Sequence, residues 1–331
     1  MIVDTHNDLL TELAFRHREP TPFSTYWRDQ LRDGGVALQV CPIYPAPEHS
    51  PEGTLRNALH QVNAFHRAVR ESQGSIVSVT RRADLMNLDP ETRLGMMLSM
   101  EGVEPLGSDP ELIELFWQLG VRLVALTWNT RNYFADGAGE PGDGGLGRLG
   151  DELVERLVGL GAILDVAHAS RRTFYGLIEA AGDTLVICSH GGCRAVHETS
   201  RNLDDEQLKV LAERGGVMGL MAHPLAVDSD RPTLERYIDH IEHAVSVMGI
   251  DHVGIGADFI RQVATSGAIP DPGRALLPPG VSLADAIENF EGPRGYPALT
   301  EGLERRGYSK DEQLAILGGN FLRVFATALP A

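Results

Sequence analysis

The sequence has few cysteines and no long apolar run, and each shortage excludes a class of protein. Three cysteines without regular spacing (Cys41, Cys188 and Cys193) do not make a disulfide framework, so we expect a reducing compartment. No apolar stretch approaches the ~20 residues of a membrane-spanning helix, and the opening MIVDTH contains no basic and apolar leader. We therefore expect a cytoplasmic protein with no membrane partner.

Positive charge is also scarce. The sequence has 29 lysine and arginine residues against 46 aspartate and glutamate residues, a formal net charge of −17 at pH 7 with histidine neutral. Such a surface repels phosphate backbones and anionic lipids, so we expect it to bind neither nucleic acid nor a membrane surface.

Motifs of several other enzyme classes are missing or misplaced. There is no G-x-x-x-x-G-K-[ST] phosphate loop and no G-x-S-x-G nucleophile elbow. The GLGRLG run at 145–150 matches G-x-G-x-x-G, but it follows a long polar loop instead of a strand. We therefore expect no dinucleotide site there.

Short apolar runs alternate with longer helical patterns along the whole chain, for example the helical patterns at 55–69, 153–160 and 234–248. Continuous apolar strands in such an alternation predict a parallel sheet covered on both faces. Eight strand–helix units predict one α/β domain that spans residues 1–331, a (β/α)8 TIM barrel with a C-terminal helical extension. An open doubly wound sheet is the less favoured alternative. The expected strands are 2–3, 36–40, 96–100, 123–127, 162–166, 185–188, 217–221 and 252–255.

Two long loops interrupt this alternation, at 44–53 and 135–150. Loops of this length in a compact domain are often functional. The stretch 270–305 has no regular pattern, and we assign it no element.

Side chains of the metal-ligand type follow most of these strands. The carboxyl ends of all strands in a parallel barrel open onto one face, where the active site is built, so residues distant in sequence converge there. His6 and Asp8 lie two residues apart on an extended strand end, which points both side chains to the same side. Glu101 ends an apolar run, where a carboxylate is desolvated unless it is paired or bound to a metal. The converging residues are His6, Asp8, Glu101, His168, His190 and Asp258.

Taken singly, each of these residues has an ordinary structural alternative. Asp8 and Asp258 could cap a helix or a turn, and Glu101 could be an acid at a helix N-terminus. His168 or His190 could be a hydrogen-bonded core histidine. Six such residues at strand ends are hard to assemble by accident, and together they suit Zn²⁺ or a similar divalent ion with an open position. A bridging carboxylate would hold two ions roughly 3.5–4 Å apart, and an aspartate left unligated could transfer protons.

Several motifs resemble those of the renal (membrane) dipeptidase family, a branch of the amidohydrolase superfamily. VDTHND at 3–8 resembles the opening motif of the family, and SMEG at 99–102 resembles its acidic motif. The matches follow the family's order along nearly the whole chain. The others are LDVAHAS at 164–170, SH at 189–190, TSRN at 199–202, GIDHVGIGADF at 249–259 and LGGNFLRVF at 317–325.

The resemblance implies a (β/α)8 barrel with a binuclear zinc site. His6 and Asp8 would hold one Zn²⁺ ion, His168 and His190 would hold the other, and Glu101 would bridge the two. A metal-bridging hydroxide would attack the scissile carbonyl group of the substrate.

The same resemblance implies roles for two further residues and the nature of the partners. Asp258 would take the proton of the hydroxide and deliver it to the leaving amine. Arg201 would pair with the free carboxylate of the substrate, which a planar guanidinium suits geometrically. The family's usual substrates are dipeptides, often with a D-residue at the carboxyl end, and dimers are common among its members. We therefore expect a dipeptide-like small-molecule substrate and a homodimer.

The sequence departs from the family pattern at two places. The renal enzymes carry a histidine after the fourth strand that helps bind the substrate carbonyl. Here LTWN at 126–129 has Trp128 instead, so Asn129 or another donor must bind that group. The family's Asp-Phe-Asp-Gly after the eighth strand is replaced by DFIR at 258–261, which includes Ile260. Because the first aspartate is kept, we expect the chemistry to remain and the substrate pocket to differ.

These observations predict a zinc-dependent hydrolase of a small amide with a free carboxylate, most simply a dipeptide. An N-acyl amino acid deacylase using the same site is one alternative. A catalytically silent barrel that binds a small ligand is another. All six inferred metal and proton-transfer positions carry competent residues, which favours the enzyme.

Overall fold

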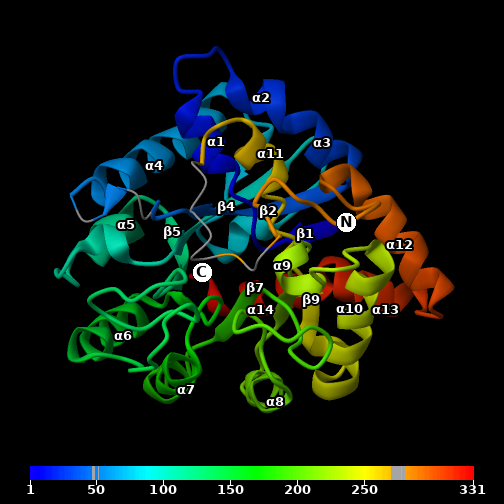
Figure 1. Cartoon of the computed structure of the whole chain (residues 1–331). Coiled ribbons are helices and arrows are strands. Elements are labelled where there is room, and N and C mark those ends of the chain that lie inside the picture. Colours follow the sequence, from blue (N-terminus) through cyan, green and yellow to red (C-terminus); the bar gives the residue numbers. More distant parts are fainter. Residues whose placement is uncertain (47–48, 51, 270–276, 278–279) are drawn as a thin grey trace.

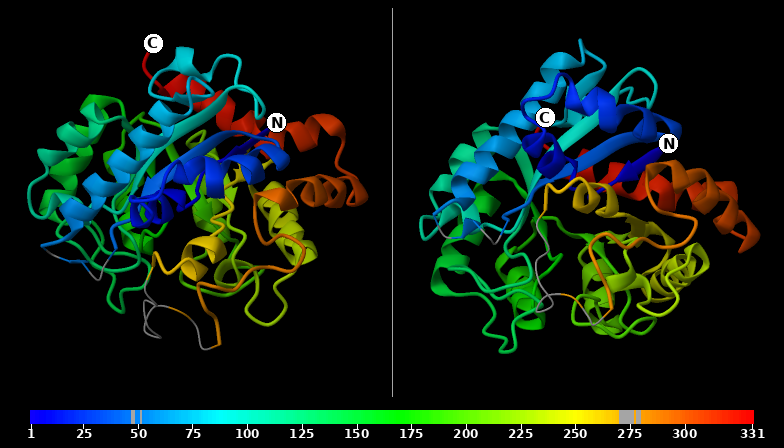
Figure 2. Two further views of the ribbon diagram at one scale, coloured as in Figure 1. Left: turned by 90° about the horizontal axis from the view of Figure 1, so that it is seen from above. Right: turned by 45° about the horizontal axis from the view of Figure 1, so that its top comes forward.

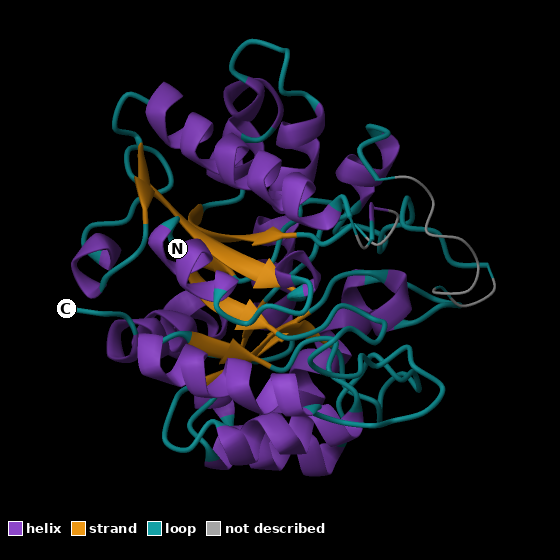
Figure 3. Ribbon diagram, turned by 90° about the vertical axis from the view of Figure 1, so that its left-hand side faces the viewer, coloured by secondary structure: helices purple, strands orange, loops and turns teal. Residues whose placement is uncertain are grey.

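The computed structural model describes residues 1–46, 49, 50, 52–269, 277 and 280–331. The other residues of the expected loop 44–53 and of the stretch 270–305 lie outside the described residues. Parallel strands occupy the centre of the molecule, and helices surround them (Figures 1 and 3). The strands are β1 (Ile2–Asp4), β2 (Val36–Ile43), β3 (Ile76–Ser78), β4 (Leu94–Glu101), β5 (Val121–Ala125), β6 (Ile163–Asp165), β7 (Val186–Gly191), β8 (Met218–Leu220) and β9 (Val253–Ile255).

Strand pairing closes the sheet into a barrel. Neighbouring strands follow the order β2-β1-β9-β8-β7-β6-β5-β4, and β2 also pairs with β4. That last pairing is parallel and runs from Leu38 opposite Gly95 to Ile43 opposite Met100. The expected (β/α)8 barrel is therefore confirmed, and the alternative of an open doubly wound sheet is wrong.

All eight expected strands are present, and β3 is an additional strand that the sequence did not predict. β3 pairs with the start of β4, with Ile76 opposite Leu94, and lies outside the closed ring of eight strands. Only a short turn at Arg82–Leu85 separates β3 from β4, so β3 does not follow the alternation of strands and helices. The apolar run of the third expected strand extends through Glu101, so this carboxylate is the last residue of β4 and not the first residue after it.

Helices cover the outside of the barrel, and the three expected ones are confirmed as α4 (Thr54–Glu71), α6 (Arg148–Leu160) and α10 (Leu234–Met248). No helix of the described part of the chain is long and apolar enough to cross a membrane. The other helices are α1 (Leu9–Phe15), α2 (Pro22–Tyr26), α3 (Arg28–Asp33), α5 (Leu112–Gln118), α7 (Arg171–Ala180), α8 (Asp205–Glu213), α9 (Pro224–Val227), α11 (Arg261–Thr265), α12 (Tyr296–Arg305), α13 (Lys310–Leu314) and α14 (Asn320–Ala328), with short turns at Arg82–Leu85, Glu104–Leu106, Ile250–His252, Pro293–Gly295 and Ala315–Gly319.

The inside of the barrel is filled at the end opposite to the carboxyl ends of the strands. Inward-facing side chains such as Val3, Leu38 and Ile163 form one buried cluster with Phe321 and Phe325 of α14. Figure 2 shows α14 (red) at one end of the barrel and α11 (gold) at the other. Burial of each such side chain contributes about 1.5–3 kcal/mol. The packed end fixes the strands, and the opposite end is left for polar side chains.

Gly256 marks a close approach of strand backbones just before Asp258. A Cβ atom at this position would overlap the carbonyl oxygen of Ser189. We expect Gly256→Ala to lower the free energy of unfolding by about 2–3 kcal/mol, because a backbone carbonyl cannot move aside as a flexible side chain can. Gly159→Ala in α6 is the matched control, since a Cβ there meets no atom within 4 Å. Urea denaturation measures both variants, and equal midpoints would contradict the close approach.

Candidate metal centre and active site

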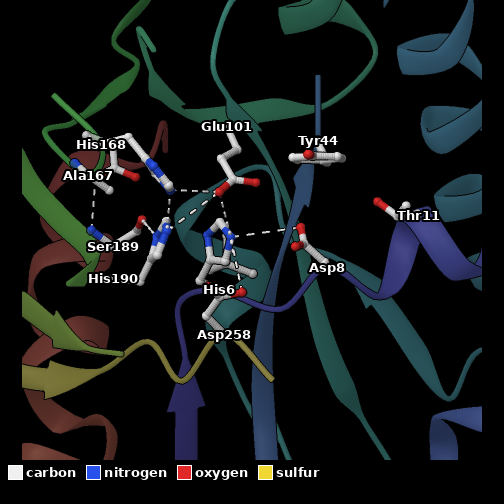
Figure 4. Close-up of polar contacts among 12 residues, drawn as sticks. His6, Asp8, Thr11, Tyr44, Glu101, Ala167, His168, Ser189, His190 and Asp258 are labelled. Atoms are coloured by element: carbon white, nitrogen blue, oxygen red, sulfur yellow. Dashed lines mark hydrogen bonds and ion pairs between the residues drawn. The ribbon is translucent and has the colours of Figure 1, made fainter. Parts of the chain in front are cut away.

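Five of the predicted ligand side chains converge at the carboxyl ends of the barrel strands (Figure 4). His6 and Asp8 follow β1, Glu101 ends β4, His168 follows β6, and His190 lies in β7. Each of the five residues is at most 5% exposed. The fold therefore brings together, and removes from water, side chains up to 184 positions apart in the sequence.

Glu101 lies at the centre of this cluster. Its Oε1 atom is 2.9 Å from Nε2 of His168, 3.4 Å from Nε2 of His6 and 3.6 Å from Nε2 of His190. The Nε2 atoms of His168 and His190 are 2.8 Å apart. One carboxylate oxygen thus faces three imidazole nitrogens, as a shared metal ligand does.

Two aspartates complete the cluster on the side of His6. The Nε2 atom of His6 is 3.9 Å from Oδ1 of Asp8 and 4.0 Å from Oδ1 of Asp258. Ligand atoms of His6, Glu101 and His190 all lie within 4.8 Å of one another, and so do those of His6, Asp8 and Asp258. The two groups share His6, and the set is large enough for more than one ion.

Asp4, at the end of β1, holds two of the segments that carry these residues. Its Oδ1 atom accepts hydrogen bonds from the backbone N–H groups of His6, at 3.2 Å, and Ala257, at 3.0 Å. A single buried carboxylate therefore fixes the chain around His6 relative to the chain around Asp258.

Asp165, at the end of β6, does the same on the other side of the site. Its Oδ1 atom accepts hydrogen bonds from the N–H groups of Ala167 and Ser189, both at 2.9 Å. These residues directly precede His168 and His190. Neither Asp165 nor Asp4 was predicted from the sequence to position the site. The sequence feature that could have identified both residues is an aspartate at the end of an apolar strand, because a carboxylate buried there needs hydrogen-bond donors.

Two of the site residues have left-handed backbone conformations. The φ angle is 62° at His168 and 53° at Asp258. Residues other than glycine rarely adopt this conformation, and they tend to do so at functional sites where the surrounding structure imposes it. Here the N–H of Asp258 donates to the carbonyl oxygen of His6 at 3.0 Å, which ties this turn to β1.

Burial and charge together set the protonation of Glu101 and His6. Burial raises the pKa of Glu101, but His6 and His168 outweigh burial and lower that pKa to about 2. Burial lowers the pKa of His6, but the negative charges of Glu101, Asp258 and Asp8 outweigh it and raise that pKa to about 10. One proton on His6 therefore offsets part of the negative charge, which a bound metal ion would do more completely.

The two aspartates bind protons more tightly than usual. Burial raises the pKa of Asp258 to about 6; His6 opposes this rise and Glu101 adds to it. Burial raises the pKa of Asp8 well above its usual value, and the charges of Glu101 and Asp258 add to the rise. Three carboxylates this close together are unfavourable without a cation.

The other two histidines are suited to bind a metal ion. Burial lowers the pKa of His168 to about 3 and that of His190 well below its usual range, so both rings are neutral near pH 7. Nδ1 of His168 lies 2.7 Å from Oδ1 of Asn129, an acceptor, so Nδ1 carries the proton and Nε2 has a free lone pair. This lone pair faces an oxygen of Glu101 at 2.9 Å. Two acceptors in that position repel each other, and a metal ion bound by both would remove the repulsion.

A cavity opens over this cluster, and its lining includes Asp8, Glu101, His168 and Asp258. Trp128 and Ile260, the two positions where the sequence departs from the family pattern, also lie in its wall, beside further apolar residues. The predicted change in the pocket therefore falls on residues that a substrate would meet.

The two predicted substrate-binding residues, Asn129 and Arg201, occupy different positions relative to the cavity. Asn129 lines the cavity, and its Oδ1 also contacts Nδ1 of His168, so the side chain orients that ring. Arg201 is 5% exposed and is not among the residues that line the cavity, and its guanidinium donates to the carbonyl oxygen of His190 at 3.0 Å. Its Nε atom has no hydrogen-bond partner among the described residues.

His223 is a cavity residue that the sequence analysis missed. It follows β8, lines the cavity and is 2% exposed. The rule that found the other residues, a polar side chain just after a barrel strand, applies equally to this histidine.

The fold and the buried cluster define a parallel (β/α)8 barrel with a site suited to metal ions. The model of the membrane dipeptidase family (peptidase family M19) matches residues 1–269. The chain therefore belongs to this family, as the sequence motifs indicated, and membership implies a metal cofactor.

Relatives of this family resemble the chain over most of its length. Dipeptidase verJ from Clonostachys rogersoniana is 27% identical over 307 residues, which cover 89% of this chain and 73% of that protein. Dipeptidase 3 from Rattus norvegicus is 28% identical over 339 residues, which cover 98% of this chain and 64% of that protein. The chain thus spans a little less than two thirds of the length of dipeptidase 3.

Solved structures of two similar proteins share the fold. Dipeptidase AC, a metallopeptidase of family M19, matches with a TM-score of 0.84 and 23% identity, over 100% of this chain and 99% of that chain. A metallopeptidase from Rhodobacter sphaeroides, solved with a phosphinate mimic of the dipeptide L-Ala-D-Ala, matches with a TM-score of 0.83 and 23% identity, over 99% of both chains.

Proposed function

We propose that this protein is a metal-dependent dipeptidase with two divalent ions, of which Zn²⁺ suits the ligands best. The observation that carries the proposal is the buried cluster around Glu101, in which imidazole nitrogens and carboxylate oxygens face one another. Nε2 of His6 and Oδ1 of Asp8 have no hydrogen-bond partner among the described residues. Mixed histidine and carboxylate sets are typical of hydrolytic zinc sites.

The ligands divide into two sets around one carboxylate. His6 and Asp8 would hold one ion, His168 and His190 the other, and Glu101 would contact both. Bound ions of this kind lower the pKa of water and polarise a carbonyl group. Asn129 keeps Nε2 of His168 unprotonated through its contact with Nδ1.

Asp258 would transfer a proton from the attacking water to the leaving amine. Its Oδ1 atom is buried and has no hydrogen-bond partner in the described part of the chain. The carboxylate lines the cavity next to the ligands. A carboxylate in this position can accept a proton from the attacking water and donate it to the leaving amine.

Arg201 would bind the free carboxylate of the substrate. Its charge lies near Asp258 and Glu101, and its buried Nε atom has no hydrogen-bond partner among the described residues. We expect Arg201→Ala to raise KM for dipeptides at least about tenfold and to change KM for their amidated analogues little, because the lost interaction is a charge-assisted pair. Arg214→Ala, at an exposed arginine, is the control. Equal changes for both kinds of substrate would remove Arg201 from the site.

The assay that tests the function measures amine release by zinc-reconstituted protein from L,L dipeptides, L,D dipeptides and N-acyl amino acids. We expect turnover of dipeptides, including those with a D-residue at the carboxyl end, like the residue in the ligand of the Rhodobacter sphaeroides structure. Turnover of N-acyl amino acids alone would indicate a deacylase, which the apolar walls formed by Met221, Leu225 and Ile260 could also serve. No turnover with metal bound would contradict both functions.

A further inference from the structure

Two aromatic side chains, those of Tyr44 and Trp128, form part of the cavity lining that we call the aromatic wall. Their rings meet edge to face, with centroids 5.5 Å apart and planes at 83°. The ring of Trp128 also lies beside that of His168, with centroids 6.1 Å apart. The aromatic wall therefore stands next to the ligand cluster, where the amide bond of a substrate would be cleaved.

The backbone of each residue of the aromatic wall is held by a buried contact. Tyr44 directly follows β2, and its N–H group donates to Oε1 of Gln61 at 2.9 Å, while Nε2 of Gln61 donates to the carbonyl oxygen of Tyr44 at 2.7 Å. Trp128 follows β5, and Gly137 approaches it so closely that a Cβ atom on Gly137 would overlap the carbonyl oxygen of Trp128. A surface held in this way can bind a side chain without first being ordered.

The order of the strands places the aromatic wall across the barrel from the groups that would handle the leaving amine. The ring runs β1-β2-β4-β5-β6-β7-β8-β9, so β5 lies opposite β9 and β2 lies opposite β7. Asp258 follows β9, and Arg201 donates to the carbonyl oxygen of His190 in β7. The C-terminal residue of a dipeptide, with its amine at Asp258 and its carboxylate at Arg201, would extend away from the aromatic wall. The N-terminal residue would extend toward it.

The charges around the cavity indicate which side chains the aromatic wall can accept. The acidic residues of the lining are Asp8, Glu101 and Asp258, which all belong to the ligand cluster. Among the described residues, the lining contains no lysine or arginine. A carboxylate on the side chain of the N-terminal residue would therefore find no cationic partner at the wall. A large apolar side chain would remove aromatic surface from water, which is favourable.

We propose that the aromatic wall binds the side chain of the N-terminal residue of the dipeptide and makes large apolar residues preferred at that position. This inference rests on the proposed function. Trp128 is the specificity-determining residue, because its indole offers the larger apolar surface and lies beside His168. The wall discriminates between substrates that share the same cleaved bond and the same metal ligands.

Trp128→Ala tests this role with three dipeptides that differ only in the N-terminal residue, Leu-Ala, Gly-Ala and Glu-Ala. We expect the wild type to cleave Leu-Ala with a kcat/KM at least about tenfold above that for the other two, and Trp128→Ala to lower this preference about tenfold. Because all three substrates use the same metal site, a general loss of activity through a displaced His168 cancels in the ratio. Trp128→Phe, which keeps an aromatic ring, and Ile260→Ala, in the wall after β9, are the controls, and both should keep the ratio within about threefold.

Binding of phosphinate analogues of Leu-Ala and Gly-Ala, measured by calorimetry on the zinc-loaded proteins, gives a readout that needs no turnover. In Trp128→Ala the Kd of the Leu-Ala analogue should rise about tenfold, and that of the Gly-Ala analogue should change less than about threefold. Equal changes for both analogues, or a wild type without preference for Leu-Ala, would overturn the inference. A wild type that cleaves no dipeptide would instead refute the proposed function, and the calorimetric comparison would still decide whether Trp128 binds an apolar side chain.

Discussion

Glu101→Gln is expected to abolish dipeptide hydrolysis, with kcat at least about 10³-fold lower, and to lower the metal content of the protein. One oxygen of Glu101 lies within 3.6 Å of the Nε2 atoms of His6, His168 and His190. Glutamine has nearly the same shape but no negative charge, and its amide nitrogen is not a metal ligand. The substitution therefore removes the charge that both ligand sets share and leaves the packing nearly unchanged.

The measurement is zinc bound per chain after dialysis, together with kcat on the dipeptide that the wild type cleaves fastest. Glu111→Gln is the matched control, because the side chain of Glu111 is 72% exposed. Full metal occupancy with normal turnover in Glu101→Gln would refute the role of Glu101 as the shared ligand.

Asp258→Asn is expected to lower kcat by about 10²–10⁴-fold while the protein keeps its bound metal. Asparagine can fill the space of the aspartate, but it cannot accept a proton from water and pass it to the leaving amine. Oδ1 of Asp258 is 4.0 Å from Nε2 of His6, so the carboxylate is close to the ligand cluster without being at its centre.

The metal content decides between two roles for Asp258, since this residue is also one of the groups that could hold an ion. Loss of turnover with metal retained supports proton transfer. Loss of metal together with turnover would instead make Asp258 a ligand. Asp251→Asn, at an exposed position just before β9, serves as the control for the charge change.

The barrel and most of the metal cluster were predictable from the sequence because both depend on short-range patterns. Strands buried on both faces appear as apolar runs, and the topology of a parallel barrel brings the residues after each run to one face. His6, His168 and His190 could therefore be brought together although their positions in the chain are far apart. β3 was not predicted, since no helix separates it from β4 and it therefore falls outside the alternation of strands and helices.

The partners of these side chains could not be predicted, because hydrogen bonds depend on distances that a sequence does not contain. Asn129 was expected to contact substrate, and the contact of its Oδ1 with His168 could not be foreseen. Asp4 and Asp165 look like ordinary strand-end aspartates until the two N–H groups that each one binds are known. His223 lies at a position that the strand-end rule covers, but its contact with the backbone N–H of Leu225 could not be predicted.

Metal titration of the chelated protein, followed by dipeptide turnover at each step, tests the central proposal most directly. We predict that the metal-free protein has no activity and that turnover appears as Zn²⁺ binds, reaching its maximum at two ions per chain. Unchanged hydrolysis after complete removal of metal would contradict the assignment of the buried cluster as the catalytic metal centre.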